Sequence, residues 1–244
     1  MNVYILETTK HLSRYGMYVD IFTRLQDPAL PMTVSIDERA RIIHIPAGPK
    51  MRCDKYILSN YIDEFVMGIV EFQRRKGVFY DLIHSHYWLS GWAAMALKEA
   101  WKVPFVHMNH TLGSINNMVV LQEEERERPI RIEMERSIAV KADRIVAASP
   151  MEKAQLVCFY GAHPSKISVI PCGVDLALFR KMEKDKARKA IGLDNRMWVL
   201  YVGRIHPVKG IDCLLEAMRI LIERFGFSRR EVRLLLIGGN PVNN

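Results

Sequence analysis

Short apolar runs rich in β-branched residues recur along the chain, separated by longer segments with apolar residues at helical spacing. The runs predict strands at residues 18–23, 41–45, 79–84, 103–108, 144–148, 167–170, 198–202 and 232–237. The segments between them predict helices at residues 55–74, 88–102, 129–142 and 151–160, and from residue 211 onward. Strands that alternate with helices are typical of βαβ units, so we expect an α/β protein with mostly parallel, doubly wound sheets.

The pattern favours two such sheets over one. A charged segment at residues 180–190 predicts a surface helix after a connecting stretch. We therefore expect a doubly wound domain at residues 1–173, and a linker with the first part of a second domain at residues 174–244. Residues 5–12 predict an amphipathic helix with no strand before it, and the second sheet pattern stops after two strands. We expect the chain to be a fragment, truncated at both ends.

Composition is ordinary for a globular protein of 244 residues. No run approaches the roughly 20 apolar residues of a membrane-spanning helix, and no secretion signal is visible, which predicts a cytoplasmic protein. The four cysteines are scattered without paired spacing, so we expect neither disulfides nor a zinc site. The net charge of +8 permits anionic partners, including a membrane surface. The basic clusters lack interleaved aromatic residues, so we expect no nucleic-acid binding.

Two cations lie where a predicted strand is followed by a helix. Arg204 and Lys209 fall in the loop after Gly203, which frees the backbone to turn. In an open α/β sheet such a loop lies at the carboxyl end of a strand, where helix N–H groups favour anions. A diphosphate is the ligand that this arrangement favours. A surface turn with two solvated cations explains the pattern equally well.

Histidines gather at the ends of two neighbouring strands: His84, His86, His107 and His110. Because adjacent parallel strands end at one edge, their rings could line one cleft. Histidines two apart on a strand share a face, so a metal site is the alternative, although no carboxylate lies beside them in sequence. Each histidine taken alone favours a structural role. Lys55 and Arg131 are further cations near helix starts, and each taken alone favours an exposed helix position.

Seven segments in order resemble the retaining GT-B glycosyltransferases, the class that includes sucrose-phosphate synthase and the glycosyltransferase of mycothiol synthesis. They are MNVYILE at Met1, VDIFTR at Val19, DLIHSHYWLSGW at Asp81, VHMNHTLG at Val106, ERSIAVKADRIVAAS at Glu135, ISVIPCGVDLALF at Ile167 and VGRIHPVKG at Val202. The resemblance implies two Rossmann-like domains. It also implies transfer of a sugar from a nucleotide diphosphate sugar, a UDP-sugar by analogy, to a small acceptor. Retention by front-side attack, without a metal or other cofactor, is implied as well.

The resemblance assigns roles residue by residue. Arg204 and Lys209 match the pair that holds the donor diphosphate, beside Gly203, and His110 matches the cleft histidine that contacts the transferred sugar. The resemblance therefore implies that Arg204, Lys209 and His110 are the catalytic residues. The positions that match the mycothiol enzyme's contacts to a phosphorylated inositol acceptor are Asn2, Lys55, Tyr87, Thr111 and Arg131.

The chain departs from the family's pattern in three places. The family's Gly-Gly turn and first strand would precede Met1, and its usual Pro-Asn-Gly is Pro171, Cys172 and Gly173 here. The paired glutamates that hold the donor would follow Asn244, so we expect weak or no activity from this chain. One alternative is a non-catalytic, anion-binding remnant. Another is a metal-dependent hydrolase that uses the four histidines.

Overall fold

The structure is a computed structural model that describes residues 1–120, 122–206, 209–228 and 230–239. Its contacts divide the chain into two compact units. The first comprises residues 1–115 and 127–172, and the second comprises residues 116–126 and 173–244. The predicted domain limits of 1–173 and 174–244 stay predictions.

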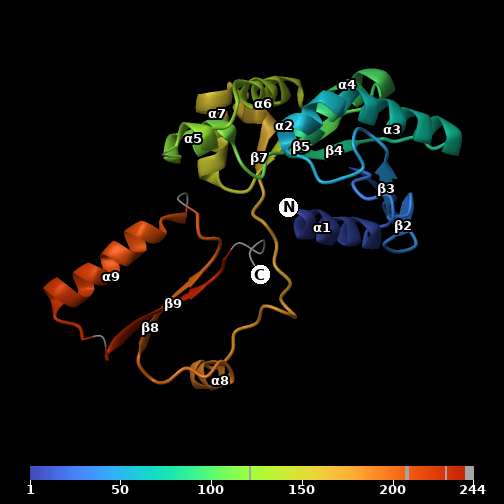
Figure 1. The fold of residues 1–244 in the computed structure, drawn as a ribbon. Coiled ribbons are helices and arrows are strands. Elements are labelled where there is room, and N and C mark those ends of the chain that lie inside the picture. The colour runs from blue at the N-terminus through green and yellow to red at the C-terminus, as the bar shows by residue number, and fades with distance from the viewer. Residues whose placement is uncertain (121, 207–208, 229, 240–244) are drawn as a thin grey trace. The chain divides into compact units, whose positions relative to one another are not determined.

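The strands of the first unit form two sheets (Figure 1). One has the order β1 (Val19–Arg24), β3 (Ala40–Ile45), β2 (Thr33–Ser35). The other has the order β4 (Ile83–His86), β5 (Phe105–Met108), β6 (Arg144–Ala147), β7 (Ile167–Val169). Every described pair is parallel except β2 with β3. The predicted parallel architecture is confirmed, while the short antiparallel β2 was not predicted.

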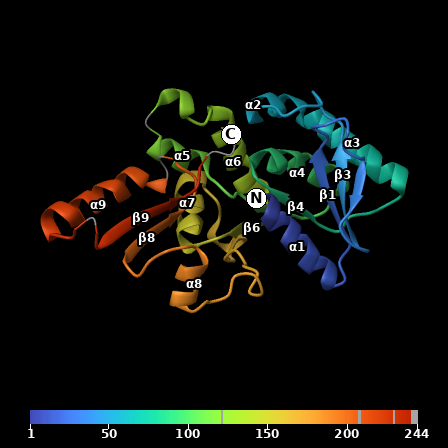
Figure 2. The same cartoon turned by 60° about the horizontal axis from the view of Figure 1, so that its bottom comes forward.

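The helices of this part of the chain connect the strands, as expected for βαβ units. They are α1 (Asn2–Arg14), α2 (Lys55–Leu58), α3 (Ile62–Lys76), α4 (Trp88–Trp101), α5 (Gly113–Val119), α6 (Pro129–Lys141) and α7 (Pro150–Tyr160). Figures 1 and 2 show α1 and α3 on opposite sides of β3. Within the described residues, no helix combines the length and the apolar character that crossing a membrane requires.

Two predicted elements differ clearly from the structure, and one helix was not predicted. The helix predicted at residues 55–74 is interrupted by a 3-10 turn, Ser59–Tyr61, where Ser59 Oγ donates to the Tyr56 carbonyl at 2.8 Å. Such a local bond competes with continuous helix. The strand predicted from residue 79 begins only at Ile83. The short helix α5 was not predicted at all.

The core of the first unit lies between the β4–β7 sheet and its helices. Trp88, Phe105 and Ile138 are fully buried there. A Cβ at Gly91 would lie 2.5 Å from Ile138 Cδ1 and 2.9 Å from His107 Cε1, so a larger residue there would force these two buried side chains to shift. This packing holds the ends of β4 and β5 in place.

The second unit contains α8 (Lys184–Ala190), β8 (Met197–Val202), α9 (Ile211–Phe225) and β9 (Val232–Ile237). β8 and β9 are parallel, as predicted. A Cβ at Gly238 would lie 1.7 Å from the Gly203 carbonyl oxygen, so the carboxyl ends of the two strands meet only because glycine is present. Leu200 and Val202 of β8 are 57% and 68% exposed, so much of this strand's apolar surface is uncovered.

Candidate functional site

Two residues with unusual backbone conformations mark the carboxyl ends of β4 and β5. Tyr87 follows β4 with φ 75° and ψ 157°, and His110 lies just beyond β5 with φ 64°. Positive φ in a residue other than glycine costs roughly 1–3 kcal/mol and is concentrated at functional sites. Both residues are among those that the family resemblance selected.

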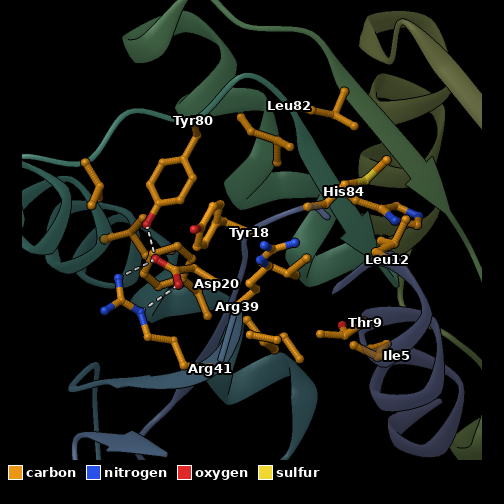
Figure 3. Close-up of a pocket in the computed structure, with 18 of the residues that line it drawn as sticks. Ile5, Thr9, Leu12, Tyr18, Asp20, Arg39, Arg41, Tyr80, Leu82 and His84 are labelled. Atoms are coloured by element: carbon orange, nitrogen blue, oxygen red, sulfur yellow. Dashed lines mark hydrogen bonds and ion pairs between the residues drawn. The ribbon is translucent and has the colours of Figure 1, made fainter. Parts of the chain in front are cut away.

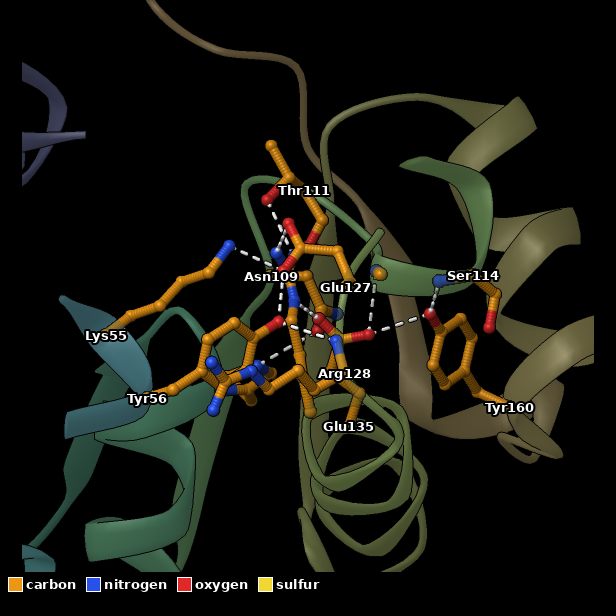
Figure 4. A network of polar contacts seen from close by, with 12 residues as sticks. Lys55, Tyr56, Asn109, Thr111, Ser114, Glu127, Arg128, Glu135 and Tyr160 are labelled. Atoms are coloured by element: carbon orange, nitrogen blue, oxygen red, sulfur yellow. Dashed lines mark hydrogen bonds and ion pairs between the residues drawn. The ribbon is translucent and has the colours of Figure 1, made fainter. Parts of the chain in front are cut away.

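Arg131 of α6 is the centre of a buried polar network (Figure 4). Its Nε donates to Glu135 at 2.8 Å and its Nη1 to Glu127 at 2.5 Å. Its Nη2 donates to the Thr111 hydroxyl at 2.9 Å and to the Thr111 carbonyl at 3.1 Å. The Arg131 side chain is 1% exposed, so the expectation of an exposed helix residue was wrong. The two glutamates, four residues to either side, supply the partners that allow its burial.

Glu127 connects Arg131 to Lys55. Its carboxylate also accepts from Lys55 Nζ and from the Tyr56 hydroxyl, each at 2.5 Å. Burial alone would raise the pKa of Glu127, but these two hydrogen bonds and the Arg131 charge hold that pKa below its ordinary value. Glu127 is therefore a carboxylate held between two cations.

Glu135 lies on the other side of Arg131. It accepts from the Gly113 N–H at 2.9 Å and from the Tyr160 hydroxyl at 2.7 Å, so its buried charge is well coordinated. Burial, together with the Glu135 charge, raises the pKa of Tyr160 to about 12, so this hydroxyl stays a donor. The positive charges of Lys55 and Arg131 are matched by the negative charges of the two glutamates.

Three of the predicted histidines lie together. The His84 and His86 rings are 4.2 Å apart between centroids, and His86 Nδ1 lies 3.0 Å from His110 Nε2. Burial lowers the pKa of His84 to about 4 and that of His86 to about 3, and also lowers the pKa of His110. The rings are therefore neutral at physiological pH, and in the His86–His110 pair one ring donates to the other.

His107 does not join that cluster through its hydrogen bonds. Its two ring nitrogens lie 2.8 Å from Ser85 Oγ and 3.2 Å from Asn109 Oδ1, and the side chain is buried. Across the described ranges of the chain, no group of three or more His, Cys, Asp or Glu side chains is arranged to hold a metal ion. The geometry of the histidines gives no support to the metal-dependent hydrolase alternative.

The structure brings most of the predicted acceptor residues together. Thr111 contacts Arg131 directly, Lys55 reaches it through Glu127, and the Tyr87 ring centroid lies 5.0 Å from the Arg131 guanidinium carbon. Asn2 is exposed at the start of α1, and none of the described contacts joins it to this cluster. Tyr4 on the same helix packs edge-on against His110, with the ring centroids 5.4 Å apart.

The predicted diphosphate pair lies in the second unit. Arg204 and Lys209 are both exposed in the segment between β8 and α9, as predicted, and residues 207–208 lie outside the described chain. The Gly203 N–H donates to the Ile237 carbonyl at 2.9 Å, which places the start of this segment at the carboxyl edge of the two strands. α9 begins after Gly210 without a side-chain cap, so its N-terminus offers backbone N–H groups. Asp212 in its first turn opposes anion binding.

Sequence reasoning missed four residues of the buried network: Tyr56, Glu127, Glu135 and Tyr160. Glu135 had a signal, because it lies four residues after Arg131 on the same predicted helix. The two tyrosines had none, because their hydroxyls reach the network from α2 and α7, which lie far away in sequence.

A parallel-sheet unit with a polar cluster at its carboxyl edge, followed by a second parallel unit, is the arrangement of the GT-B glycosyltransferases. The profile of Glycosyltransferase Family 4 matches residues 1–178, and the chain belongs to this family. The predicted family and fold class are confirmed.

Particular relatives share most of this chain. It is 37% identical to a D-inositol 3-phosphate glycosyltransferase of Gordonia bronchialis, over 98% of this chain and 53% of the relative. It is 38% identical to the enzyme of that name from Corynebacterium efficiens, over 98% of this chain and 57% of that relative. Sucrose-phosphate synthase from Thermosynechococcus elongatus superposes with a TM-score of 0.83 at 31% identity, over all of this chain and 58% of that one. The chain spans about half the length of the curated relatives that it matches.

Proposed function

We propose that the protein transfers a sugar from a nucleotide diphosphate sugar, taken to be a UDP-sugar, to a hydroxyl of a small phosphorylated acceptor. The reaction proceeds with retention.

The observation that carries this proposal is the convergence of Lys55 and Arg131 on one carboxylate at the carboxyl edge of β5. Two cations that hold the oxygens of Glu127 can also hold the oxygens of a phosphate, which accepts the same charge-assisted bonds. Thr111 and Tyr87 border the same cluster. The name of the curated relatives, which gives inositol 3-phosphate as what they act on, supports a phosphorylated acceptor.

The donor diphosphate binds Arg204 and Lys209 in this proposal. Negative charge builds up on the leaving diphosphate as the glycosidic bond breaks, and two cations at the carboxyl edge of β8 stabilise it. The uncapped N–H groups of α9 add to the attraction. Both side chains are exposed, which leaves them accessible to a ligand.

His110 contacts the transferred sugar in this proposal. Because burial lowers its pKa, its ring is neutral and serves as a hydrogen-bonding group, with His86 fixing its orientation. The acceptor hydroxyl attacks from the face that the diphosphate leaves and gives its proton to the departing phosphate oxygen. No side chain has to act as a general base.

A transfer assay tests the proposal. A version extended to the length of the relatives is incubated with UDP-sugars and either inositol phosphates or sugar phosphates, and released UDP and new glycoside are measured. We expect acceptor-dependent UDP release that Arg204→Ala abolishes. Replacement of the exposed Lys181 by alanine is the matched control and leaves the rate unchanged. Absence of both transfer and UDP release would contradict the proposal.

A second candidate is an anion-binding module without catalysis, favoured because the Lys55–Glu127–Arg131 cluster is complete within one unit. Calorimetry of the 244-residue chain with inositol phosphates separates this candidate from an inert fragment. Binding that Lys55→Ala weakens, without turnover in the extended version, would support the module. Lys98→Ala, which removes a similarly half-buried lysine paired with Asp143, is the control.

A further inference from the structure

Three donors from two parts of the chain meet on the carboxylate of Glu127 (Figure 4). Lys55 Nζ and the Tyr56 hydroxyl each lie 2.5 Å from Glu127 Oε2. Arg131 Nη1 lies 2.5 Å from Oε1 of the same carboxylate. Lys55 and Tyr56 come from the start of α2, and Arg131 comes from the first turn of α6. Two cations and one neutral hydroxyl thus surround one anionic group, which is an arrangement that suits an oxyanion ligand.

The Tyr56 hydroxyl is oriented as a donor toward this position. It accepts the Arg128 N–H at 2.8 Å, so its single proton is directed at Glu127. The ring is fixed as well, because its centroid lies 5.9 Å from that of Trp88 and 4.6 Å from the Arg128 guanidinium carbon. Burial, together with the hydrogen bond to Glu127, raises the pKa of Tyr56, so the proton stays on the hydroxyl. Any anion in the place of the carboxylate meets the same donor.

The contacts of Arg131 divide into fixed and exchangeable ones. Its Nη2 donates to the carbonyl and the hydroxyl of Thr111, and its Nε donates to Glu135. Glu135 lies within α6 and also accepts from the Tyr160 hydroxyl at 2.7 Å, which keeps it in place. The Nη1 group faces Glu127 and is therefore the part of this guanidinium that a ligand oxygen can take over.

Glu127 can leave its position without disturbing a helix. It precedes α6, which begins at Pro129, and it follows the exposed 3-10 turn Glu123–Glu125. A rotation of its side chain therefore breaks no hydrogen bond of α6. The Glu127 side chain is 9% exposed and that of Lys55 is 31% exposed, so solvent reaches this position beside Lys55.

We propose that Tyr56 is a third ligand of the acceptor phosphate, beside Lys55 and Arg131, and that the Glu127 carboxylate occupies the phosphate position until the acceptor binds. This inference rests on the proposed function, whose acceptor site it extends by one residue. One phosphate oxygen replaces Glu127 Oε2 between Lys55 and Tyr56, and another replaces Oε1 beside Arg131. Because one anion replaces another, neither cation is left without a counter-charge, which would be costly for the buried Arg131.

The shared position makes the effect of the Tyr56 hydroxyl depend on Glu127. In the native chain, loss of the hydroxyl weakens the hold on the carboxylate and the hold on the phosphate alike, so the net affinity for phosphate changes little. When the carboxylate is absent, the same loss weakens only the hold on the phosphate. A tyrosine that merely supports the fold would lower the free energy of unfolding and show no such dependence.

Calorimetry of the 244-residue chain with inositol 3-phosphate tests this dependence. Tyr56→Phe is compared in the native chain and in the Glu127→Ala variant. We expect it to change the affinity by less than about threefold in the native chain and to weaken it at least about tenfold in Glu127→Ala. Urea denaturation shows that each variant is folded. If Glu127→Ala does not fold, Glu127→Gln provides a second variant without the competing charge, and the same direction is expected.

Tyr80→Phe is the matched control (Figure 3). The Tyr80 hydroxyl donates to Asp20 at 2.6 Å, and Asp20 also accepts from Arg41 Nε at 2.7 Å, so this hydroxyl also binds a carboxylate that is paired with an arginine. Tyr80 lines a cavity of about 1030 Å³ between α1, β1 and β4, and the cluster around Arg131 takes no part in that lining. We expect Tyr80→Phe to leave the affinity unchanged with and without Glu127.

Three outcomes would overturn the proposal. A loss of less than about threefold on adding Tyr56→Phe to Glu127→Ala would show that Tyr56 does not bind the phosphate. An equal, large loss with and without Glu127 would show that the carboxylate does not share the phosphate position. Absence of binding in every variant would show that these donors form no phosphate site. Because turnover plays no part in this test, a failure of the transfer assay alone would not change its result.

Discussion

Replacing Glu127 by glutamine removes one negative charge from between two cations and keeps the side-chain volume. In the native protein this carboxylate accepts from Lys55 and Arg131, each at 2.5 Å, so it occupies the donors that a phosphate would use. The charges of Lys55, Arg131, Glu127 and Glu135 cancel. With glutamine the cluster carries one net positive charge.

The expected gain in affinity follows from Coulomb's law. Two like charges roughly 5 Å apart repel by roughly 3 kcal/mol at an effective dielectric constant of about 20. Lys55 is 31% exposed, so solvent screens part of this repulsion. We expect Glu127→Gln to bind inositol phosphate about tenfold more tightly than the native chain, which corresponds to about 1.4 kcal/mol. Loss of charge-assisted hydrogen bonds should lower the free energy of unfolding by about 1.5–3 kcal/mol.

Calorimetry with the 244-residue chain measures the affinity, and urea denaturation measures the stability. Asp143→Asn is the matched control, because it also removes one carboxylate paired with a lysine. Asp143 accepts from Lys98 and from the Phe105 N–H at the start of β5, far from the carboxyl edge. This control should leave phosphate affinity unchanged.

Two results would refute the reasoning. If Glu127→Gln binds phosphate no more tightly than the native chain, Glu127 does not compete with an anionic acceptor. If it binds more weakly while Asp143→Asn does not, Glu127 serves to position Lys55 and Arg131. Its charge would then favour binding.

Three further predictions follow from the same structure. Arg131→Met leaves the Glu135 carboxylate buried without its cation, so urea denaturation should show a free energy of unfolding lower by about 3–5 kcal/mol. A loss under about 1 kcal/mol would contradict a buried ion pair between Arg131 and Glu135. The pKa of His86 is about 3 in the folded chain, against an ordinary value of 6.5. Between these pH values the unfolded chain binds a proton at His86 that the folded chain does not, so the free energy of unfolding falls as the pH drops from 6.5 toward 3. The slope is about 1.4 kcal/mol per pH unit for this histidine, and a flat profile in urea denaturation between pH 7 and 5 would contradict it. The double variant Arg204→Ala with Lys209→Ala should bind UDP at least about tenfold more weakly than the native chain in calorimetry. Unchanged UDP binding would show that Arg204 and Lys209 do not belong to the donor site.

The fold was largely predictable because the alternation of strands and helices depends on local patterns of apolar residues. The errors lie where tertiary contacts decide. Phe79 and Tyr80 have the composition of a strand, yet Tyr80 hydrogen-bonds to Asp20 and stacks on Trp101 with the ring centroids 5.0 Å apart. No local pattern distinguishes an apolar residue in a strand from one that lines a cavity.

The candidate site was predictable in part for a similar reason. Lys55, Tyr87 and Thr111 were selected through the family's motifs, and the structure groups them around Arg131. Glu127 was missed because a carboxylate beside the glutamate run at residues 123–125 looks solvated in sequence. Its burial depends on Tyr56 and Lys55, more than 70 residues away. The cytoplasmic location and the identity of the donor stay predictions.

Acceptor discrimination tests the central claim most directly. The extended version is assayed with one UDP-sugar, and kcat/KM is measured for an inositol phosphate and for unphosphorylated inositol. We predict a preference for the phosphorylated acceptor of at least about 100-fold, or about 2.7 kcal/mol, which Lys55→Ala reduces by about tenfold or more. Equal kcat/KM values for the two acceptors, or a preference that Lys55→Ala leaves intact, would contradict the assignment of this cluster as the acceptor phosphate site.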